Sequence, residues 1–322
     1  MAINLLALKP HKVSRDLSGY ITYIYGPGGA GKTTFGAATP KPLLLAFEKG
    51  YNALPGVIAQ DITTWGELKQ VLRELKKPEV KETFSTIIID TVDIASQLCE
   101  KYLCNQLGIE NIGDGGWATN GWAKVKKEWE STFRAVTMEG YALVFISHSK
   151  DKTFKPKNAP EYNQIVPSCS TAYNEIIKNM ADIMGYIEIS NGERRLILRS
   201  NDESVDCKCR FKMIEPEIDF SYKSLVEALN RAIDAEANST GNQFVTNERA
   251  TNTTVISYDY DIQKNEFNDI VGKIMTKNQA NGPKITAIVD KYLGKGKKVS
   301  EATPEQAELI YLINIELKED LL

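Results

Sequence analysis

The residues with the most specific chemistry in this sequence form one glycine-rich run, which a second threonine, Thr34, follows directly. The run is Gly26-Pro27-Gly28-Gly29-Ala30-Gly31-Lys32-Thr33. It fits the pattern G-x-x-x-x-G-K-[ST], in which glycines let backbone N–H groups turn toward the phosphates of a nucleotide. We expect Lys32 to reach the β- and γ-phosphates and the Thr33 hydroxyl to bind Mg²⁺. The run and Thr34 therefore predict a site for ATP and Mg²⁺.

Asp90 is the candidate for a second protein group beside the magnesium ion. It ends the apolar run Ile87-Ile88-Ile89, and ligands of open α/β sheets bind at the carboxyl ends of the strands. The alternative is that Asp90 caps a helix, although Asp93 is better placed for a cap. We therefore predict Thr33 and Asp90 as the residues of the metal site.

Glu48 and His148 also follow strand-like runs, so both should emerge at the same edge of a parallel sheet. Glu48 either polarises the water that attacks the γ-phosphate or is a solvated glutamate at a strand end. His148 either senses the γ-phosphate and passes its presence to the next loop or is a structural histidine. The catalytic interpretation makes both residues part of the nucleotide site.

Strand-like and helix-length segments alternate through the first two-thirds of the chain. The predicted strands are 20–25, 43–47, 86–89 and 142–147, and the predicted helices are 65–76, 93–107 and 122–138. Apolar strands separated by helices predict an α/β fold whose mostly parallel sheet is covered on both faces. Asn191-Gly192 suits a type I′ turn, so the strands 183–190 and 194–199 should add an antiparallel hairpin at one edge of the sheet.

The rest of the sequence predicts two further regions after a core at 1–235. Residues 236–257 are rich in Asn, Thr and Ser and lack apolar periodicity, which is typical of a flexible linker. Residues 258–322 predict a small helical module. Apolar residues recur there at helical spacing from Ile285 to Tyr292, and Thr303-Pro304-Glu305-Gln306 is typical of a helix start.

Composition excludes several classes of protein. The net charge of −3 gives no general attraction to nucleic acid or membranes, so any such binding must come from a local patch. No apolar stretch approaches the roughly 20 residues that span a bilayer, and the N-terminus lacks the layout of a signal peptide, so we expect a cytoplasmic protein. The five cysteines and two histidines have no zinc-site spacing, which favours reduced thiols.

With these residues in place, the chain resembles the RecA-like recombinase ATPases. The nearest resemblance is to phage-encoded nucleotide-binding AAA-domain proteins of the Sak type, which anneal single strands. Over residues 18–235 it rests on five blocks in order: GPGGAGKTT, AFEKG, TIIIDTVD, LVFISHSKD and DCKCRF. It implies a RecA-like P-loop core that hydrolyses ATP in DNA recombination.

The same resemblance assigns roles to four residues. Glu48 takes the water-activating position, although it lies closer to the phosphate loop than in bacterial RecA. His148 falls where the family has a glutamine or histidine that leads into a DNA-binding loop. Lys208 and Arg210 resemble a basic pair that reaches the γ-phosphate of a neighbouring protomer, which implies a ring or filament. The alternative for this pair is a solvated face of an edge strand.

Two segments are candidates for contact with single-stranded DNA. After His148, the sequence interleaves lysines with an aromatic residue, which could track phosphates and stack a base; these residues are Lys150, Lys152, Phe154, Lys155 and Lys157. The second candidate is the glycine-rich stretch 113–122, with Trp117 and Trp122. The alternatives are a solvated lysine loop and tryptophans that pack in the core.

The C-terminal module has no catalytic signature. Its basic cluster, Lys291, Lys295, Lys297 and Lys298, precedes an acidic and apolar terminal helix. The module could contact DNA, dock a partner such as a single-strand binding protein, or serve oligomerisation or solubility. The leading prediction for the whole chain is a DNA-stimulated recombination ATPase. The alternatives are a nucleotide-gated binding protein with negligible turnover and, disfavoured because no arginine-rich lid is present, a small-molecule kinase.

Overall fold

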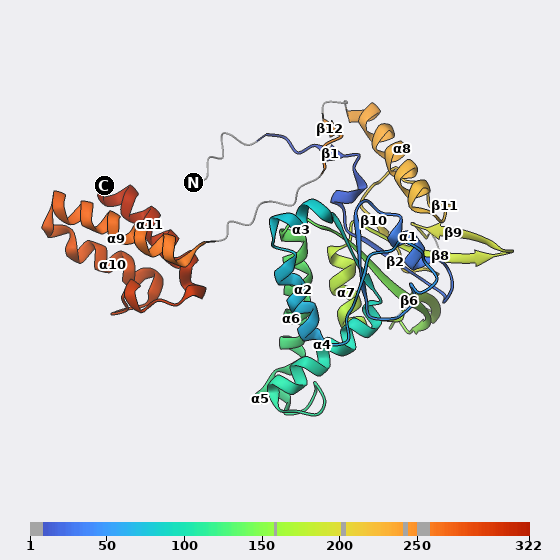
Figure 1. Cartoon of the computed structure of the whole chain (residues 1–322), viewed down its shortest axis with the longest axis horizontal. Coiled ribbons are helices and arrows are strands. Elements are labelled where there is room, and N and C mark those ends of the chain that lie inside the picture. The colour runs from blue at the N-terminus through green and yellow to red at the C-terminus, as the bar shows by residue number, and fades with distance from the viewer. Residues whose placement is uncertain (1–8, 158–159, 201–203, 241–243, 250–257) are drawn as a thin grey trace. The chain divides into compact units, whose positions relative to one another are not determined.

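A computed structural model describes residues 9–157, 160–200, 204–240, 244–249 and 258–322. The chain divides into two compact units, Pro10–Thr254 and a second unit that contains Val255–Leu322 (Figure 1).

The large unit is built on one sheet with the strand order β11-β9-β8-β2-β6-β5-β3-β4. The strands are β2 (Thr22–Gly26), β3 (Pro42–Ala46), β4 (Ala59–Asp61), β5 (Thr86–Asp90), β6 (Ala142–Phe154), β8 (Ile183–Ser190), β9 (Glu193–Ile197) and β11 (Glu217–Asp219). Pairing is parallel from β8 through β2, β6, β5 and β3 to β4, and antiparallel at β8–β9 and β9–β11. The prediction of an α/β fold with a mostly parallel sheet and an antiparallel edge hairpin is confirmed.

Helices cover both faces of this sheet. They are α1 (Lys32–Ala37), α2 (Trp65–Glu74), α3 (Pro78–Thr83), α4 (Val92–Leu107), α5 (Gly116–Thr119), α6 (Gly121–Met138), α7 (Thr171–Met180) and α8 (Tyr222–Thr240). Successive residues of a strand point to opposite faces. Tyr23 and Tyr25 therefore join one buried cluster, with side chains of α2, α4, α6 and α7, and Ile24 joins the other, with side chains of α1 and α8.

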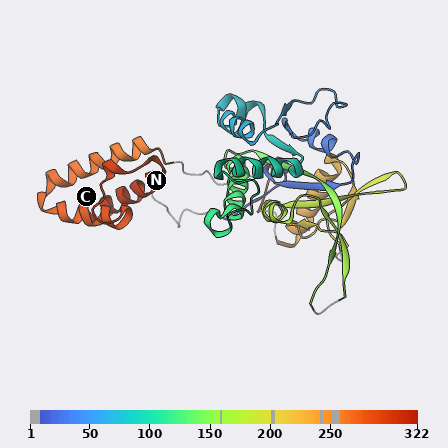
Figure 2. The same ribbon diagram turned by 90° about the horizontal axis from the view of Figure 1, so that it is seen from below.

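Two hairpins leave the sheet. In the β8–β9 hairpin, Asn191 and Gly192 have φ values of 51° and 83°, as a type I′ turn requires. β6 continues past the sheet and pairs with β7 (Tyr162–Pro167) from Ser149↔Pro167 to Phe154↔Tyr162 (Figure 2). The segment after His148 was expected to be a loop. It is a strand because β7 pairs with its backbone groups. The sequence of the segment alone does not reveal this pairing.

The segment expected to be a flexible linker, 236–257, is partly ordered into the large unit. Helix α8 continues to Thr240, and β12 (Val245–Thr246) pairs with β1 (Val13–Ser14), which precedes the short helix η2 (Leu17–Gly19). The linker prediction is wrong for these residues because strand pairing fixes a segment whose polar composition resembles a linker. Residues 241–243 and 250–257 lie outside the described residues.

Arg249 adds a second attachment of this segment. Its guanidinium donates hydrogen bonds of 3.0 Å to the Ser18 carbonyl and 2.9 Å to the Ser85 carbonyl. Both acceptors belong to the large unit, so the chain is still part of that unit at Arg249.

The second unit contains the helices α9 (Tyr260–Lys277), α10 (Gly282–Leu293) and α11 (Ala307–Leu321), with the short helices η4 (Gln279–Asn281), η5 (Val299–Glu301) and η6 (Pro304–Gln306). Its own buried cluster includes Ile274, Ile288 and Ile310. The Thr303 hydroxyl and the Gln306 side chain form a capping box at η6. Within the described part of the chain, no helix combines the length and apolar character needed to cross a membrane.

Candidate functional site

The glycine-rich run lies between the end of β2 and the start of α1, with Lys32 as the first residue of the helix. Gly29 and Gly31 have φ values of 73° and 93°, a region that glycine adopts without steric cost. A Cβ atom on Gly28 or Gly29 would meet no other atom within 4 Å. The loop therefore curves around open space, as a phosphate-binding loop must.

Lys32 lies inside this loop. Its ammonium group donates hydrogen bonds of 2.8 Å to the Gly26 carbonyl and 2.7 Å to the Pro27 carbonyl. Burial lowers the pKa of Lys32, and the carboxylates of Asp90 and Glu48 act in the opposite direction. The loop carbonyls thus hold a buried positive charge next to the open space.

Thr33 and Asp90 are in direct contact, with 2.6 Å between Thr33 Oγ1 and Asp90 Oδ2. Burial raises the pKa of Asp90, while the hydrogen bond from Thr33 acts to lower it. Both oxygens are hard donors of the kind that Mg²⁺ prefers. The described residues contain no group of three or more His, Cys, Asp or Glu that could hold a metal ion by themselves. The pair therefore fits a magnesium ion that takes its remaining ligands from nucleotide phosphates and water.

Glu48 follows β3 and lies beside the end of β5. The backbone N–H groups of Phe47 and Glu48 donate to the Asp90 carbonyl over 2.7 and 3.2 Å. The Glu48 carboxylate accepts a 2.6 Å hydrogen bond from Thr91 Oγ1, and its second oxygen lies 3.5 Å from His148 Nε2. The structure thus brings together Glu48, which follows β3, Asp90 at the end of β5, and His148, where β6 leaves the main sheet.

These residues share one cavity of about 290 Å³ with the phosphate loop. Its lining residues are Gly29, Ala30, Gly31, Lys32, Thr33, Thr34, Glu48, Gly50, Ala53, Leu54, Asp90, Thr91 and His148. The side chains of Glu48 and His148 are 36% and 40% exposed, so water can reach both. A cavity with a buried cation, two metal-binding oxygens and an accessible carboxylate has the groups needed for triphosphate hydrolysis.

The sequence suggested that Asp93 caps helix α4, but Asp93 does not occupy the cap position. Thr91 occupies the N-cap position, and the Asp93 carboxylate accepts hydrogen bonds from the His148 backbone N–H and the Ser168 hydroxyl. Ser168 also donates its backbone N–H to the His148 carbonyl over 2.8 Å. Asp93 therefore joins the start of α4 to the base of the β6–β7 hairpin.

The β6–β7 hairpin presents cations and aromatic rings together. Residues at alternate positions of a strand share a face, so Lys150, Lys152 and Phe154 lie on one face of β6. The rings of Phe154 and Tyr162 stack with centroids 5.3 Å apart, and Lys152 Nζ lies 4.7 Å from the Phe154 centroid. This face has the elements of a surface that binds single strands, namely positive charge and stacked rings.

The remaining lysines of this segment differ in their surroundings. Lys155 forms a 2.9 Å ion pair with Glu161, which partly neutralises its charge, whereas Lys157 is exposed. Lys150 Nζ donates to the Ser168 carbonyl over 2.9 Å. Lys150 and Lys152 are therefore better placed for a phosphate backbone than Lys155.

Trp117 and Trp122 do not line the nucleotide cavity. Trp117 is fully exposed on α5, and Trp122, at the start of α6, is 48% exposed. Helix α5 lies at one extremity of the large unit (Figure 1). The alternative that these rings pack in the core is wrong, because Trp117 has no neighbour that covers it.

Lys208 and Arg210 lie away from the phosphate loop of their own chain. The strand β10 (Lys208–Cys209) pairs with the start of β8, whereas the loop follows the end of the parallel strand β2. Lys208 Nζ donates to the carbonyl of Lys178 over 2.7 Å, and Arg210 Nε lies 3.2 Å from Asp182 Oδ1. Any contact of this pair with a nucleotide therefore requires a neighbouring protomer.

Arg194 is a residue at the phosphate loop that sequence reasoning missed. Its Nη1 atom lies 3.4 Å from the position of a Cβ atom on Gly31, and a ring carbon of Phe220 lies 3.7 Å from the same position. The neighbouring Arg195 pairs with Glu217 and Asp219, while the Arg194 guanidinium has no carboxylate within 4 Å among the described residues. The only signal in the sequence was a pair of arginines after the Asn191-Gly192 turn, with nothing to place them beside the loop.

Comparison with known proteins gives two findings. A family model described as AAA domain matches residues 18–211, which include every residue of the cavity and also Arg194, Lys208 and Arg210. The SPbeta prophage-derived uncharacterized protein YorG of Bacillus subtilis (strain 168) is similar to this chain, with 29% identity over 332 residues. That similarity covers 99% of this chain and 99% of the relative, so it extends beyond the family match into the C-terminal unit.

Proposed function

The chain belongs to the AAA domain family of nucleotide-dependent P-loop proteins, and from this premise we propose that it is a Mg²⁺-dependent ATPase that acts on single-stranded DNA. The prophage-derived relative supports a phage origin. As the resemblance to Sak-type proteins implies, the activity would be annealing or strand exchange during recombination. The partners would be single-stranded DNA and further copies of this chain.

One observation carries this proposal: the nucleotide cavity and the hairpin are connected by direct contacts. The Glu48 carboxylate lies 3.5 Å from His148 Nε2. His148 is a residue of β6, the strand that continues outward as the first strand of the hairpin. Asp93 fixes the base of the hairpin through the His148 backbone and the Ser168 hydroxyl. A change at the cavity therefore has a short route to the surface with Lys150, Lys152 and Phe154.

Different residues of the cavity would bind the phosphates, hold the metal ion and accept a proton. When bound, Mg²⁺-ATP supplies the phosphoanhydride bond that is cleaved and a metal charge that offsets the negative phosphates. Lys32 exchanges its two carbonyl acceptors for phosphate oxygens. Thr33 and Asp90 would hold the Mg²⁺ ion, and the partly exposed Glu48 carboxylate would accept a proton from the attacking water.

Proton transfer to Glu48 provides the link to DNA. Protonation removes the negative charge of the Glu48 carboxylate and so alters its 3.5 Å contact with His148 Nε2. His148 then shifts relative to the base of the hairpin, which changes the placement of the cationic face. Lys208 and Arg210 of an adjacent protomer would stabilise the charge that develops on the γ-phosphate in a ring or filament.

Trp117 would supply a second stacking contact with DNA, because its ring is fully exposed. Every base offers a π face, so such contacts tolerate any sequence. The C-terminal unit would recruit a further partner, such as a single-strand binding protein.

A binding measurement tests the DNA part of the proposal. Fluorescently labelled oligothymidylate is titrated with the full chain at low salt, with and without a non-hydrolysable ATP analogue. Binding that weakens steeply as salt is added is the expected result, because lysines that neutralise phosphates release counterions. Absence of binding in both conditions would overturn the recombination proposal but leave the nucleotide site standing.

A second candidate function is a nucleotide-gated binding protein with negligible turnover. The observation in its favour is that Thr91 and His148 already occupy both oxygens of the Glu48 carboxylate, which would weaken a general base. Measured hydrolysis that Glu48→Gln removes would eliminate this candidate.

A further inference from the structure

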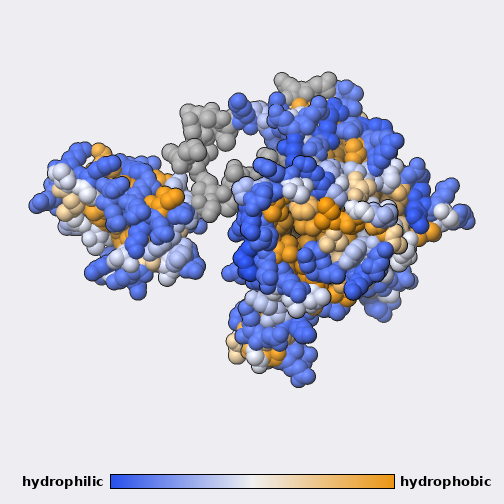
Figure 3. All heavy atoms as spheres, in the orientation of Figure 1, coloured by the Kyte–Doolittle hydropathy of each residue, from blue (hydrophilic) through white to orange (hydrophobic). Residues whose placement is uncertain are grey.

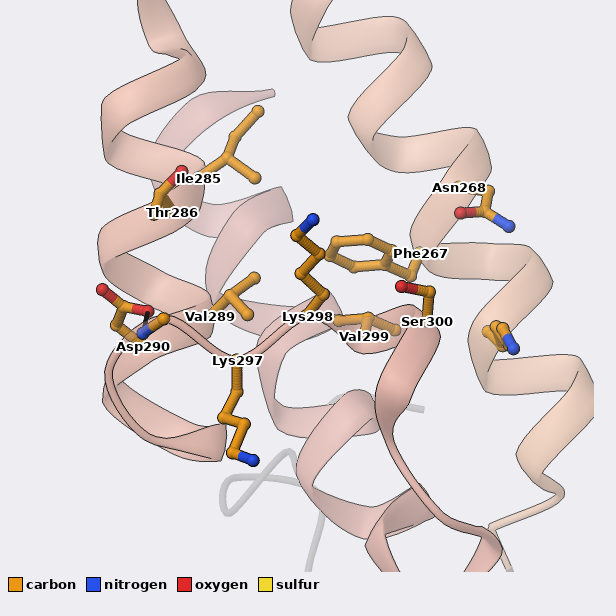
Figure 4. Close-up of a pocket in the computed structure, with 12 residues that line it drawn as sticks. Phe267, Asn268, Ile285, Thr286, Val289, Asp290, Lys297, Lys298, Val299 and Ser300 are labelled. Atoms are coloured by element: carbon orange, nitrogen blue, oxygen red, sulfur yellow. Dashed lines mark hydrogen bonds between the residues drawn. The ribbon is translucent and has the colours of Figure 1, made fainter.

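A cavity of about 630 Å³ lies in the C-terminal unit, between α9, α10 and the segment that joins α10 to η5 (Figure 4). Its lining residues are Lys264, Phe267, Asn268, Ile285, Thr286, Val289, Asp290, Gly296, Lys297, Lys298, Val299 and Ser300. Pockets that bind ligands typically have volumes of about 300–1,000 Å³. The cavity is therefore large enough for two or three side chains of a partner.

The floor of this cavity is apolar. Ile285, Val289 and Val299 are 8%, 6% and 4% exposed and belong to the buried cluster of the unit, and the half-buried Phe267 packs against that cluster. In Figure 4, Ile285 and Val289 extend from α10 into the cavity, and the Phe267 ring extends into it from α9. Such a floor favours an aliphatic or aromatic side chain of a ligand.

The rim of the cavity is cationic. Lys297 and Lys298 are exposed, and within the described residues neither has a carboxylate within 4 Å. The third lysine, Lys264, donates to the Tyr260 hydroxyl over 3.2 Å. By contrast, Lys291 and Lys318 of the same unit pair with Glu316 and Glu266.

The charge at the rim is opposite in sign to the net charge of the C-terminal unit. Residues 258–322 contain nine lysines, no arginine and eleven aspartates and glutamates, a net charge of −2. The rim nevertheless has three lysines and one carboxylate, that of Asp290. Because the local charge is opposite to the surrounding charge, the cavity favours an acidic ligand over a neutral one.

The lining of the cavity also contains one carboxylate, that of Asp290. Its Oδ1 atom accepts a 2.8 Å hydrogen bond from the Gly296 backbone N–H, which holds the lysine-containing segment at the end of α10. The carboxylate also adds one negative charge to the lining of the cavity. A phosphodiester has no hydrogen-bond donor to offer such a lining, whereas a peptide presents backbone N–H groups beside its acidic side chains.

We propose that this cavity binds a short acidic peptide segment of another protein. An aliphatic or aromatic side chain fills the apolar floor, and carboxylates pair with Lys297 and Lys298. The inference does not depend on ATP hydrolysis or on DNA binding by the large unit.

Segments of this chain are poor occupants. Residues 1–8 and 250–257 contain no aspartate or glutamate. The acidic C-terminal end is held in helix α11, which extends to Leu321, and Leu321 packs against the buried cluster of the unit. The acidic peptide of this proposal is therefore a segment of a different protein.

Three fluorescein-labelled peptides test the proposal by polarisation with the full chain. The first has the sequence Asp-Asp-Glu-Leu-Phe, the second replaces the acidic residues to give Ser-Ser-Gln-Leu-Phe, and the third replaces the apolar residues to give Asp-Asp-Glu-Ser-Ser. We expect the first to bind at least about tenfold more tightly than either control, because each control lacks the carboxylates or the burial of two apolar side chains. Equal binding of all three, or binding of none, would overturn the proposal.

Matched charge reversals locate the site. Lys297→Glu with Lys298→Glu should weaken binding of the first peptide by about tenfold or more. Lys273→Glu with Lys284→Glu changes the charge of the unit equally, but both positions are exposed and outside the cavity lining, so the effect should be below about twofold. Equal weakening by both variants would contradict a specific site.

Two further measurements separate this proposal from the other possible occupants and from the nucleotide site. Unlabelled oligothymidylate should fail to displace the peptide, and displacement would identify nucleic acid as the occupant and overturn the proposal. Peptide binding should persist in Lys32→Ala without ATP. Loss of peptide binding in that variant would show that the cavity depends on the nucleotide site and would contradict the inference.

Discussion

The nucleotide cavity and the C-terminal cavity differ in the groups that line them. The nucleotide cavity, of about 290 Å³, is lined by backbone and charged groups that come from separate strand ends. The C-terminal cavity, of about 630 Å³, has an apolar floor between helices with lysines at its rim. On the proposals made above, the first would select a ligand by fixed polar contacts and the second by shape and charge.

The difference also concerns how each cavity connects with the rest of its unit. At the nucleotide cavity, Glu48 contacts Thr91 and His148, and Asp93 fixes the base of the hairpin. At the C-terminal cavity, the contact between Asp290 and Gly296 joins the last turn of α10 to the segment directly after it. We therefore expect variants of the nucleotide cavity to alter DNA binding at the hairpin of the large unit as well. Variants of the C-terminal cavity should alter only ligand binding at that cavity. Figure 3 shows one face of each unit, coloured by hydropathy.

Lys32→Ala should produce the largest effect. It removes the buried ammonium group of the phosphate loop, and we expect ATP hydrolysis to fall by at least about 100-fold, as when one group that stabilises the transition state is lost. Steady-state phosphate release measures this, with the exposed Lys49→Ala as control. Turnover at the wild-type rate would contradict the assignment of the loop.

Glu48→Gln should give the next largest effect. Loss of a general base typically costs about 10²–10⁴-fold in rate, while the amide keeps the size of the side chain, so binding of a fluorescent ATP analogue should persist. The measurement is hydrolysis and analogue binding in the same preparation. If hydrolysis continues at half the original rate or more, Glu48 is not the base.

The hairpin variant Lys152→Ala with Phe154→Ala should weaken DNA binding by an intermediate amount. Loss of one stacked base costs about 1–3 kcal/mol, and loss of one phosphate contact lowers the magnitude of the salt slope by about 1. Thr153→Ala with Lys155→Ala changes the opposite face of β6 and the residue directly after that strand, and serves as the control. Equal losses in the two variants would move the DNA path away from the face with Lys150.

Arg194→Ala should give the smallest effect of this series. Its guanidinium lies against Gly31 without a carboxylate partner among the described residues, so a charge-assisted contact with a phosphate worth about 1.5–3 kcal/mol is expected. Nucleotide affinity should therefore fall by about tenfold or more. Arg195→Ala is the matched control, because Arg195 pairs with Glu217 and Asp219. No difference between the variants would exclude Arg194 from the site.

The nucleotide cavity could be predicted from the sequence because its chemistry depends on local order. A complete phosphate loop after a strand, and an aspartate at the end of an Ile-rich strand, fix the positions of Thr33 and Asp90 once the strands are parallel. Glu48 and His148 were placed by the same rule. The contact between Thr33 and Asp90 shows that the rule was sufficient here.

The features that could not be predicted depend on pairing between distant segments. Arg194 reaches the loop because β8 pairs with β2, which is more than 150 residues earlier in the chain. Likewise, Lys150 and Lys152 lie on a strand because β7 pairs with them. In the C-terminal unit, the sequence grouped Lys291 with Lys297 and Lys298, but Lys291 pairs with Glu316 and only the other two line the cavity.

If the nucleotide cavity and the hairpin act together, the rate of ATP hydrolysis must respond to increasing concentrations of oligothymidylate. We expect the rate to rise and saturate over the range in which DNA binds, and the rise to be smaller in Lys152→Ala with Phe154→Ala. A rate that stays constant while DNA binds to saturation would contradict this coupling.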